Sequence, residues 1–225
     1  MTTVQLSINE VFETIQGEGF HTGVPSIFVR LQGCPVGCPW CDTKHTWTLD
    51  DAFLTTADKV ITKTQESEAF FNADATALLA EFKRLQYTAK HVVITGGEPC
   101  MYDLSELTTL LHAQGFSTQI ETSGTYEVRC HPDTFVTVSP KVDMKGGMDV
   151  LTSALQRADE IKHPVAMQKH VDELDALLAR LDTLPKRVCL QPISQQQRAT
   201  DLAIKTCIER NWRLSLQTHK YIGIE

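Results

Sequence analysis

Short runs of apolar and mostly β-branched residues recur along the chain, and their length predicts β-strands. Between several of these runs, apolar residues return at the 3.6-residue spacing of a helix with one buried face. The predicted strands cover 27–31, 91–95, 117–121, 135–138, 188–191 and 213–217, with a weaker one near 160–162. The predicted helices hold Leu78, Leu79, Phe82 and Leu85, then Leu104, Leu107, Leu110 and Leu111, and then Val171, Leu174, Leu177, Leu178 and Leu181.

Local signals predict both ends of the second helix and a further helical stretch. Asp103 can accept a hydrogen bond from a free N–H group of the first turn, so we predict it as the N-cap. Gly115 favours the left-handed conformation in which many helices stop, so it predicts the end. The helix-like stretch 56–64 lies in a segment too long for a simple loop, which we interpret as an insertion of about 45–72.

Strands that alternate with helices predict βαβ crossovers and a parallel sheet, either doubly wound or curled into a full or partial barrel. Polar groups follow the predicted strands at 34–41, 96–99, 122–124, 139–141, 192–194 and 219–220. Parallel strands deliver such loops to one rim, where barrel enzymes hold their catalytic groups. For each loop taken alone, the alternative that its polar residues only cap helices stays open.

The composition predicts one packed domain over residues 1–225, because a chain of this length with 42% apolar residues can bury a substantial core. A net charge of −7 argues against a sequence-independent nucleic-acid partner and favours a small molecule. No apolar run is long enough to cross a bilayer, and the N-terminus lacks the features of a signal peptide. We therefore expect a cytoplasmic protein with no membrane partner.

The seven cysteines are an odd number, and three of them fall between Cys34 and Cys41. This clustering does not resemble a secreted disulfide framework, and in a reducing compartment it indicates metal binding. The remaining cysteines are scattered, so we interpret them as small core or near-surface residues: Cys100, Cys130, Cys189 and Cys207.

Cys34, Cys38 and Cys41 have the spacing C-x3-C-x2-C, with proline and glycine between them that let a short loop wrap a metal. Three thiolates can hold three irons of a [4Fe-4S] cubane and leave the fourth iron open to another ligand. The alternative is a structural zinc site, for which His45 would supply the fourth ligand.

The cysteine spacing, with Trp40 before the last cysteine, resembles the signature of the radical S-adenosylmethionine (SAM) superfamily. The resemblance implies a partial (βα)6 TIM-like barrel and a cluster that cleaves SAM to a 5′-deoxyadenosyl radical, with the three cysteines as catalytic ligands. A second element of that family, GGEP, matches 96–99 at the end of a predicted strand. Taken alone, GGEP would be a tight turn with a capping glutamate.

Further motifs resemble the 7-carboxy-7-deazaguanine synthase family, the ring-contracting enzymes of queuosine and 7-deazapurine biosynthesis, a tRNA modification pathway. The resemblance covers most of the chain and implies conversion of 6-carboxy-5,6,7,8-tetrahydropterin to 7-carboxy-7-deazaguanine with loss of ammonia, a lyase reaction. The motifs that carry it lie at 15–19, 30–34, 41–44, 94–99, 120–124, 138–141 and 217–220.

The resemblance also implies the residues that bind the pterin. The guanidinium of Arg30 is a fixed fork of donors suited to a carboxylate, and Gln16 and Glu18 can pair with the edges of an aminopyrimidinone ring. A surface ion pair for Arg30 and a structural role for His219 are the alternatives. The full set is Ile15, Gln16, Gly17, Glu18, Arg30, Thr95 and His219.

For SAM, the family's contacts fall on Trp40, Gly97, Ser123, Ser139, Pro140, Lys141 and Gln191, with 191–194 near the adenine. The family also uses Mg2+ beside the substrate carboxylate, held here by Thr43, which could otherwise only cap the loop. A homodimer and a reductant such as flavodoxin or ferredoxin are further implications. A glycyl-radical-activating enzyme shares C-x3-C-x2-C and is the alternative function, but it gives no role to Arg30 or Thr43.

Overall fold

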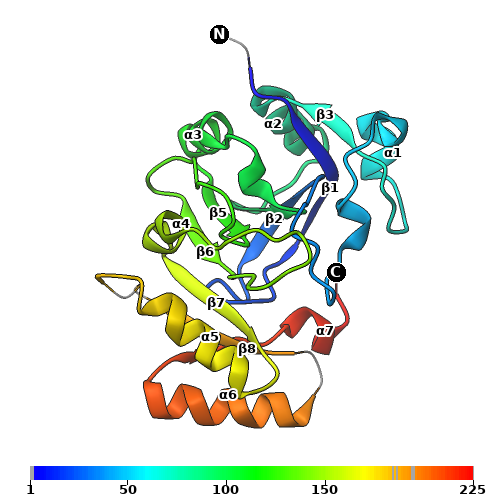
Figure 1. Ribbon diagram of the computed structural model, residues 1–225. Helices are drawn as coiled ribbons and strands as arrows, with labels where there is room; N and C mark the ends of the chain where they lie inside the picture. The colour runs from blue at the N-terminus through cyan, green and yellow to red at the C-terminus, as the bar shows by residue number, and fades with distance from the viewer. Residues whose placement is uncertain (1–2, 184, 186, 194–195, 225) are drawn as a thin grey trace.

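A single sheet of nine strands organises the described part of the chain, residues 3–183, 185, 187–193 and 196–224 of a computed structural model (Figure 1). Its order is β3-β1-β2-β4-β5-β6-β7-β8-β9. The strands are β1 Leu6–Ile15, β2 Pro25–Leu31, β3 Phe71–Ala73, β4 His91–Gly96, β5 Ser117–Thr122, β6 Phe135–Val138, β7 Glu160–Val165, β8 Val188–Pro192 and β9 Arg213–Leu214.

Every neighbouring pair from β2 to β9 is parallel, whereas β1 pairs antiparallel with both β2 and β3. The register sets Arg30 beside Thr95 and Thr122 beside Val138, so the strands reach the same edge together. The loops that follow the parallel strands therefore open on one rim, as predicted. This is the mixed α/β architecture of a partial, TIM-like barrel.

The two sides of the partial barrel are joined through the segment that follows β1. The backbone N–H and the hydroxyl of Thr218 both donate to the Gly17 carbonyl, at 2.9 and 2.7 Å. The N–H of Gly19 donates to the Ser215 hydroxyl at 2.9 Å. These bonds place the 16–19 segment beside the C-terminal strand and helix, from 196 to 201 positions away along the chain.

Helices cover the sheet (Figure 1). Their apolar faces are buried in two clusters. One cluster lies between α2, α3 and the strands β1 to β5, and the other between α4, α5, α6 and β6 to β8. The helices are α1 Ala57–Ile61, α2 Ala75–Arg84, α3 Ser105–Ala113, α4 Thr152–Arg157, α5 Gln168–Leu178, α6 Gln197–Arg210 and α7 Thr218–Ile222. Among the described residues, no helix combines the length and apolarity that crossing a bilayer requires.

The strand predictions are confirmed with two adjustments of length. The run at 160–162 grows into β7, six residues long, whereas the run at 213–217 keeps only the two residues of β9. The N–H of Ser215 still donates to the Leu190 carbonyl of β8 at 2.9 Å, and Gln217 then begins α7 as its N-cap.

Helix α3 begins one residue later than Asp103 predicts. Leu104 is the N-cap, and Asp103 instead accepts from the N–H of Ser105 at 3.0 Å, so it turns the chain just before the helix. Gly115 follows the helix at φ +81, as predicted. Leu85 and Leu181 also lie just beyond the ends of α2 and α5.

The interpreted insertion joins the edge of the sheet. It contains short 3-10 helices at Lys44–Thr46 and Asp51–Phe53, then α1 and β3. Strand β3 pairs with β1, and Leu54 bridges to Phe70. The segment therefore adds one strand to the sheet and places α1 against β1.

Replacement of Ile120 by alanine is expected to lower the free energy of unfolding by about 2–5 kcal/mol, because this fully buried side chain of β5 leaves a cavity. Denaturant unfolding of the purified protein measures the change. The matched control is Ile208→Ala on α6, whose side chain is 77% exposed and whose loss should change stability by less than about 0.5 kcal/mol. Equal losses in both variants would contradict the core assignment.

Candidate active site

A cavity of about 900 Å³ lies at the rim where the parallel strands end. Almost all of the residues predicted for the site line it. They are Cys34, Cys38, Cys41 and Thr43 of the cluster loop, then Ile15, Gln16, Gly17, Glu18, Arg30, Thr95 and His219, and then Trp40, Gly97, Ser123, Ser139, Lys141 and Gln191. Pro140 is buried behind this lining, and Ser194 lies outside the described residues.

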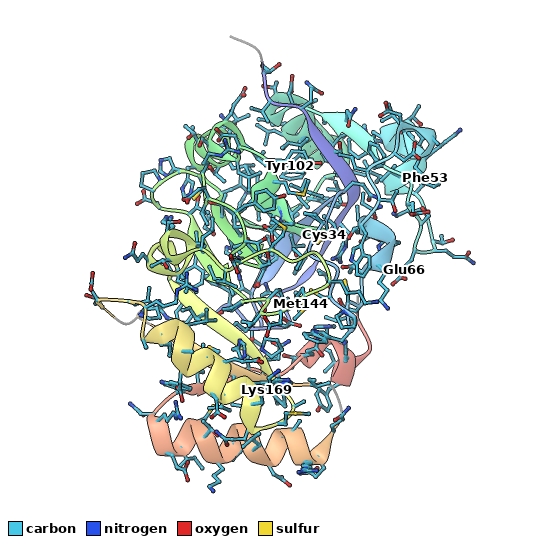
Figure 2. The ribbon with its side chains drawn as sticks, viewed as in Figure 1. Cys34, Phe53, Glu66, Tyr102, Met144 and Lys169 are labelled. Carbon is cyan, nitrogen blue, oxygen red and sulfur yellow. The ribbon has the colours of Figure 1, made fainter. Side chains whose placement is uncertain are left out.

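The cysteine loop leaves the end of β2 and is held at both sides by backbone bonds. The N–H groups of Gly33 and Cys34 donate to the carbonyls of Thr46 and Trp47, at 2.8 and 3.1 Å. Within the loop, the N–H of Cys41 donates to the Cys38 carbonyl at 3.1 Å. Figure 2 shows Cys34 near the middle of the molecule, inward of Glu66 on the inserted segment.

The thiols of this loop match the donor set of a cubane. All three thiols face one cavity. Each would bind a different iron of the cubane, so the three sulfur atoms need not point at a single atom. Burial raises the pKa of Cys34 to about 11 and also raises the pKa of Cys38, an effect that the nearby Lys141 ammonium opposes. Iron binding would therefore displace thiol protons, and Lys141 favours the resulting thiolate.

His45 does not join the cysteines as the zinc alternative requires. Its ring nitrogens lie 3.9 Å from a Glu10 oxygen and 3.4 Å from a Glu66 oxygen. Among the described residues, no three His, Cys, Asp or Glu side chains converge on a point where a single ion would sit. The geometry thus gives no support to a closed, four-ligand zinc site.

The 96–99 loop contacts the cysteine loop through its backbone. The N–H of Gly97 donates to the Leu31 carbonyl at 2.9 Å, and the N–H of Glu98 donates to the Gly33 carbonyl at 2.8 Å. A Cβ atom on Gly97 would collide with the Gly33 carbonyl and lie 3.1 Å from the Cys34 Cβ atom. Glycine at this position is therefore required by the close approach of the two loops.

Glu98 is almost completely buried and joins the loops that follow β4 and β5. Its Oε1 accepts from the Cys100 N–H at 2.9 Å and from the Thr122 hydroxyl at 2.6 Å. Its Oε2 accepts from both the N–H and the hydroxyl of Ser123. A buried carboxylate with four donors is fully satisfied, so it fixes Ser123 at the cavity wall.

Arg30 is held by an acidic partner that the sequence did not point to. Its Nε donates to Glu10 of β1 at 2.5 Å, and Lys63 of the inserted segment lies 3.7 Å from the same carboxylate. Lys63 also donates to Asn9 at 2.8 Å. The guanidinium therefore lies in the cavity wall as part of a partly buried network, which argues against a simple surface ion pair.

Residues from both ends of the chain also line the cavity. Gly17 packs so closely on His219 of α7 that a Cβ atom would collide with its Nδ1. Gln217, the N-cap of α7, donates to Glu18 at 2.9 Å. Gln16 is 4% exposed and accepts from the Glu18 N–H at 3.1 Å.

Two charged residues beside Glu18 escaped the sequence prediction. Lys162 and Glu121 both line the cavity, and Lys162 bridges Glu18 and Glu121. Glu121 lies inside a motif that carries the family resemblance. Lys162 ends the weak predicted strand at 160–162, and a charged residue in a buried strand is the signal that could have identified it as a site residue.

The side chains predicted for SAM form a second polar group in the cavity. Lys141 donates to the Ser139 hydroxyl at 2.6 Å, and burial lowers the pKa of its ammonium. Gln191 accepts from the Ser215 hydroxyl at 3.1 Å. Trp40 is 48% exposed, so its ring lies at the mouth rather than in the core.

Thr43 precedes the first 3-10 helix without using its hydroxyl as a cap. The Thr43 hydroxyl instead lies 3.6 Å from the Cys41 sulfur, on the cavity side of the loop. The Thr43 carbonyl accepts from both the N–H and the hydroxyl of Thr46, and the hydroxyl oxygen of Thr43 has two lone pairs, so it can also accept another ligand. An oxygen donor of this kind suits Mg2+.

Comparisons with known proteins give consistent matches. A model of the radical SAM superfamily matches residues 28–133. The 7-carboxy-7-deazaguanine synthase of Escherichia coli (strain K12) is 59% identical over 222 residues, 98% of this chain and 100% of that protein. The protein of that name from Buchnera aphidicola subsp. Schizaphis graminum (strain Sg) is 44% identical over 218 residues, 96% and 98% of the two chains.

The same likeness extends to three dimensions. The crystal structure of QueE from Escherichia coli matches this structure with a TM-score of 0.93 and 59% sequence identity. The match covers 96% of this chain and 95% of that chain, so the two chains share nearly the whole fold.

Replacement of Gly97 by alanine is expected to separate the 96–99 loop from the cysteine loop and to lower iron and sulfide content after anaerobic reconstitution. The cause is the collision of the new methyl group with the Gly33 carbonyl. Gly115→Ala is the matched control, because Gly115 has a φ of +81 but open space around it. Alanine is strained at this φ, so the variant should lose about 1 kcal/mol of folding stability and still load iron fully. Full iron loading of the Gly97 variant would contradict the packing argument.

Proposed function

The chain belongs to the 7-carboxy-7-deazaguanine synthase family of radical SAM enzymes, and on this premise we propose that it converts 6-carboxy-5,6,7,8-tetrahydropterin to 7-carboxy-7-deazaguanine with loss of ammonia. The observation that carries the proposal is the meeting, in one cavity, of three cysteines, the glycine-rich loop and a set of donors and acceptors suited to a carboxypterin. The product would enter queuosine biosynthesis.

The family implies a [4Fe-4S] cluster and SAM, and the cluster, when bound, supplies the electron that cleaves the sulfonium of SAM. Cys34, Cys38 and Cys41 would hold three of its irons. Ser139 and Lys141, which are hydrogen-bonded to each other, would bind the polar groups of SAM, and Gly97 would let the backbone approach its amino group. The task of these residues is to orient SAM and to exclude water from the radical.

The residues proposed for the pterin divide its recognition between two ends. At one end, Arg30 would donate to the carboxylate, with Thr95 beside it in the register of β2 and β4. At the other, Gln16, Glu18 and His219 would pair with the aminopyrimidinone ring, beside Ile15 and Gly17. Fixed at both ends, the substrate would present one carbon atom to the SAM side of the cavity.

We propose Mg2+ as a further cofactor, with the Thr43 hydroxyl as a ligand beside the substrate carboxylate. A divalent cation there would neutralise the carboxylate and hold the rearranging ring. The support is the hydroxyl that faces the cavity without serving as a helix cap.

The remaining proposals rest on family membership. They are a single domain over 1–225, a homodimer, a reductant such as flavodoxin or ferredoxin, and a cytoplasmic location. A glycyl-radical-activating enzyme is not favoured, because such a function leaves the polar groups of Arg30, Gln16 and Glu18 in the cavity without a task.

Protein reconstituted with iron and sulfide under anaerobic conditions, then given reductant, SAM and carboxytetrahydropterin, is expected to release 7-carboxy-7-deazaguanine, detected by mass spectrometry. Cys38→Ala should abolish product because one iron loses its ligand, whereas Cys207→Ala, which removes a buried thiol of α6 from the second apolar cluster, should retain it. Absence of product from a fully loaded wild-type protein would reject the proposed function.

Thr43→Ala is expected to raise the Mg2+ concentration for half-maximal rate on the order of tenfold, because one oxygen ligand is lost. Thr43→Ser keeps the hydroxyl and serves as the matched control, with a change of about twofold or less. Steady-state rates over a Mg2+ titration measure the effect. If both variants follow the wild-type titration, Thr43 is not a ligand.

A further inference from the structure

Three charged side chains from distant parts of the chain meet in the wall of the cavity. The Lys162 Nζ atom of β7 lies 2.6 Å from Glu18 Oε2 and 3.0 Å from Glu121 Oε2 of β5. Only 6% of the Lys162 side chain is exposed, yet all three residues line the cavity.

We propose that Lys162, held by Glu121, is the positioning residue that fixes Glu18 as an anionic acceptor for the aminopyrimidinone ring of the substrate. The inference rests on the proposed function and adds Lys162 and Glu121 to the groups on which substrate recognition depends. Lys162 acts through Glu18 and does not itself need to touch the pterin.

The hydrogen bonds of Glu18 leave it oriented but not saturated. Oε2 accepts from Lys162, and Oε1 accepts from Gln217 at 2.9 Å. A carboxylate offers about four acceptor positions, so two stay available to a ligand. An aminopyrimidinone ring presents a ring N–H beside an amino group, and two parallel donors of this kind suit one carboxylate.

The backbone of the acceptor is fixed as well. The Glu18 N–H donates to the Gln16 side chain, and the next residue, Gly19, donates to Ser215. The two residues proposed to read the ring edge are therefore preorganised together before substrate enters, which lowers the entropy cost of binding.

The charges around Glu18 decide its protonation. Burial alone would raise the pKa of Glu18, but Lys162, with Gln217 and His219, outweighs it and lowers the pKa to about 2. Lys141 also faces the group as a cation, and Glu121 as an acid. Without Lys162, burial and Glu121 would dominate, and Glu18 would take up a proton.

Glu121 completes the arrangement. Burial raises the pKa of Glu121 to about 7, with Glu18 and Glu160 acting in the same direction against Lys162. Its Oε1 accepts from Gln119 at 2.8 Å, which fixes the carboxyl group facing Lys162. Lys162 is thus held between two carboxyl groups, those of Glu18 and Glu121. Of the two, only Glu18 belongs to the segment proposed to bind the ring.

A purely structural role explains this trio poorly. Buried ion pairs are costly to desolvate, and well-packed apolar residues of similar size often stabilise a fold at least as well. The trio moreover lies in the wall of a cavity rather than within either apolar cluster. Charge at this place is best explained by the ligand that the cavity receives.

The test is equilibrium binding of 6-carboxypterin, the oxidised and unreactive analogue, to reconstituted wild type and to K162M, at about pH 8 and about pH 6. We expect K162M to bind about tenfold more weakly at the higher pH. The loss should grow at the lower pH, because the raised pKa of Glu18 lets it be protonated as pH falls. Protonation of the pterin itself affects both proteins equally, so it cancels when the affinity of K162M is divided by the affinity of wild type at each pH.

Two further variants separate positioning from damage to the fold. K162R keeps the cation and should recover most of the affinity and the wild-type pH dependence. In an E18Q background, adding K162M should change the affinity by less than about twofold, since Lys162 then has no anion to position. SAM affinity and iron content should match wild type in every variant. K162M leaves the Glu121 carboxylate without its ion-pair partner. If K162M for this reason does not load iron, the E121Q/K162M protein replaces it in the comparison of pterin affinity with wild type at the two pH values.

The outcomes are distinguishable. Wild-type affinity and pH dependence in K162M, or an equal loss from K162M with and without Glu18, would overturn the positioning role. If wild type with an intact cluster does not bind the pterin at all, the proposed function fails, and the inference fails with it.

Discussion

The rest of the structure depends on one constraint, the parallel pairing of seven successive strands. In this series, β2 pairs with β4, and each later strand pairs with the next as far as β9. In a parallel sheet every strand must be re-entered from the same end, so each following loop reaches the same rim. The cysteine loop, the glycine-rich loop and the loops that carry Ser123 and Lys141 are therefore neighbours, although they are scattered over about a hundred positions of sequence.

Close backbone contact then turns a set of neighbouring loops into one site. Gly97 approaches the cysteine loop more closely than a side chain would allow, and Glu98 accepts four hydrogen bonds from the loops after β4 and β5. These contacts fix the place of the proposed cluster relative to the proposed SAM groups before any ligand binds. Such preorganisation is the main contribution that a protein makes to cofactor-based chemistry.

The substrate side is organised by charge instead. Glu10 with Lys63 holds Arg30 at one end, and Lys162 with Glu121 holds Glu18 at the other. Each ligand-facing charge thus has an opposite charge behind it, which limits the cost of keeping ions in a partly buried cavity. The inserted segment supplies Lys63, so it takes part in this organisation through α1 and its flanking residues.

The sequence by itself determined the parallel α/β fold, most strand positions and the family, because apolar periodicity and the spacing of cysteines and glycines are local signals. The elements that it missed are β1, β3, α4, α6 and α7. In β1, asparagine and glutamate within the strand obscure the apolar pattern, and in α6 a buried face of alanine, threonine and cysteine does so. Only the tertiary structure decided the partners of Arg30 and Glu18. Those pairings join residues up to 199 positions apart, and no local pattern encodes which polar groups the folded sheet will bring together.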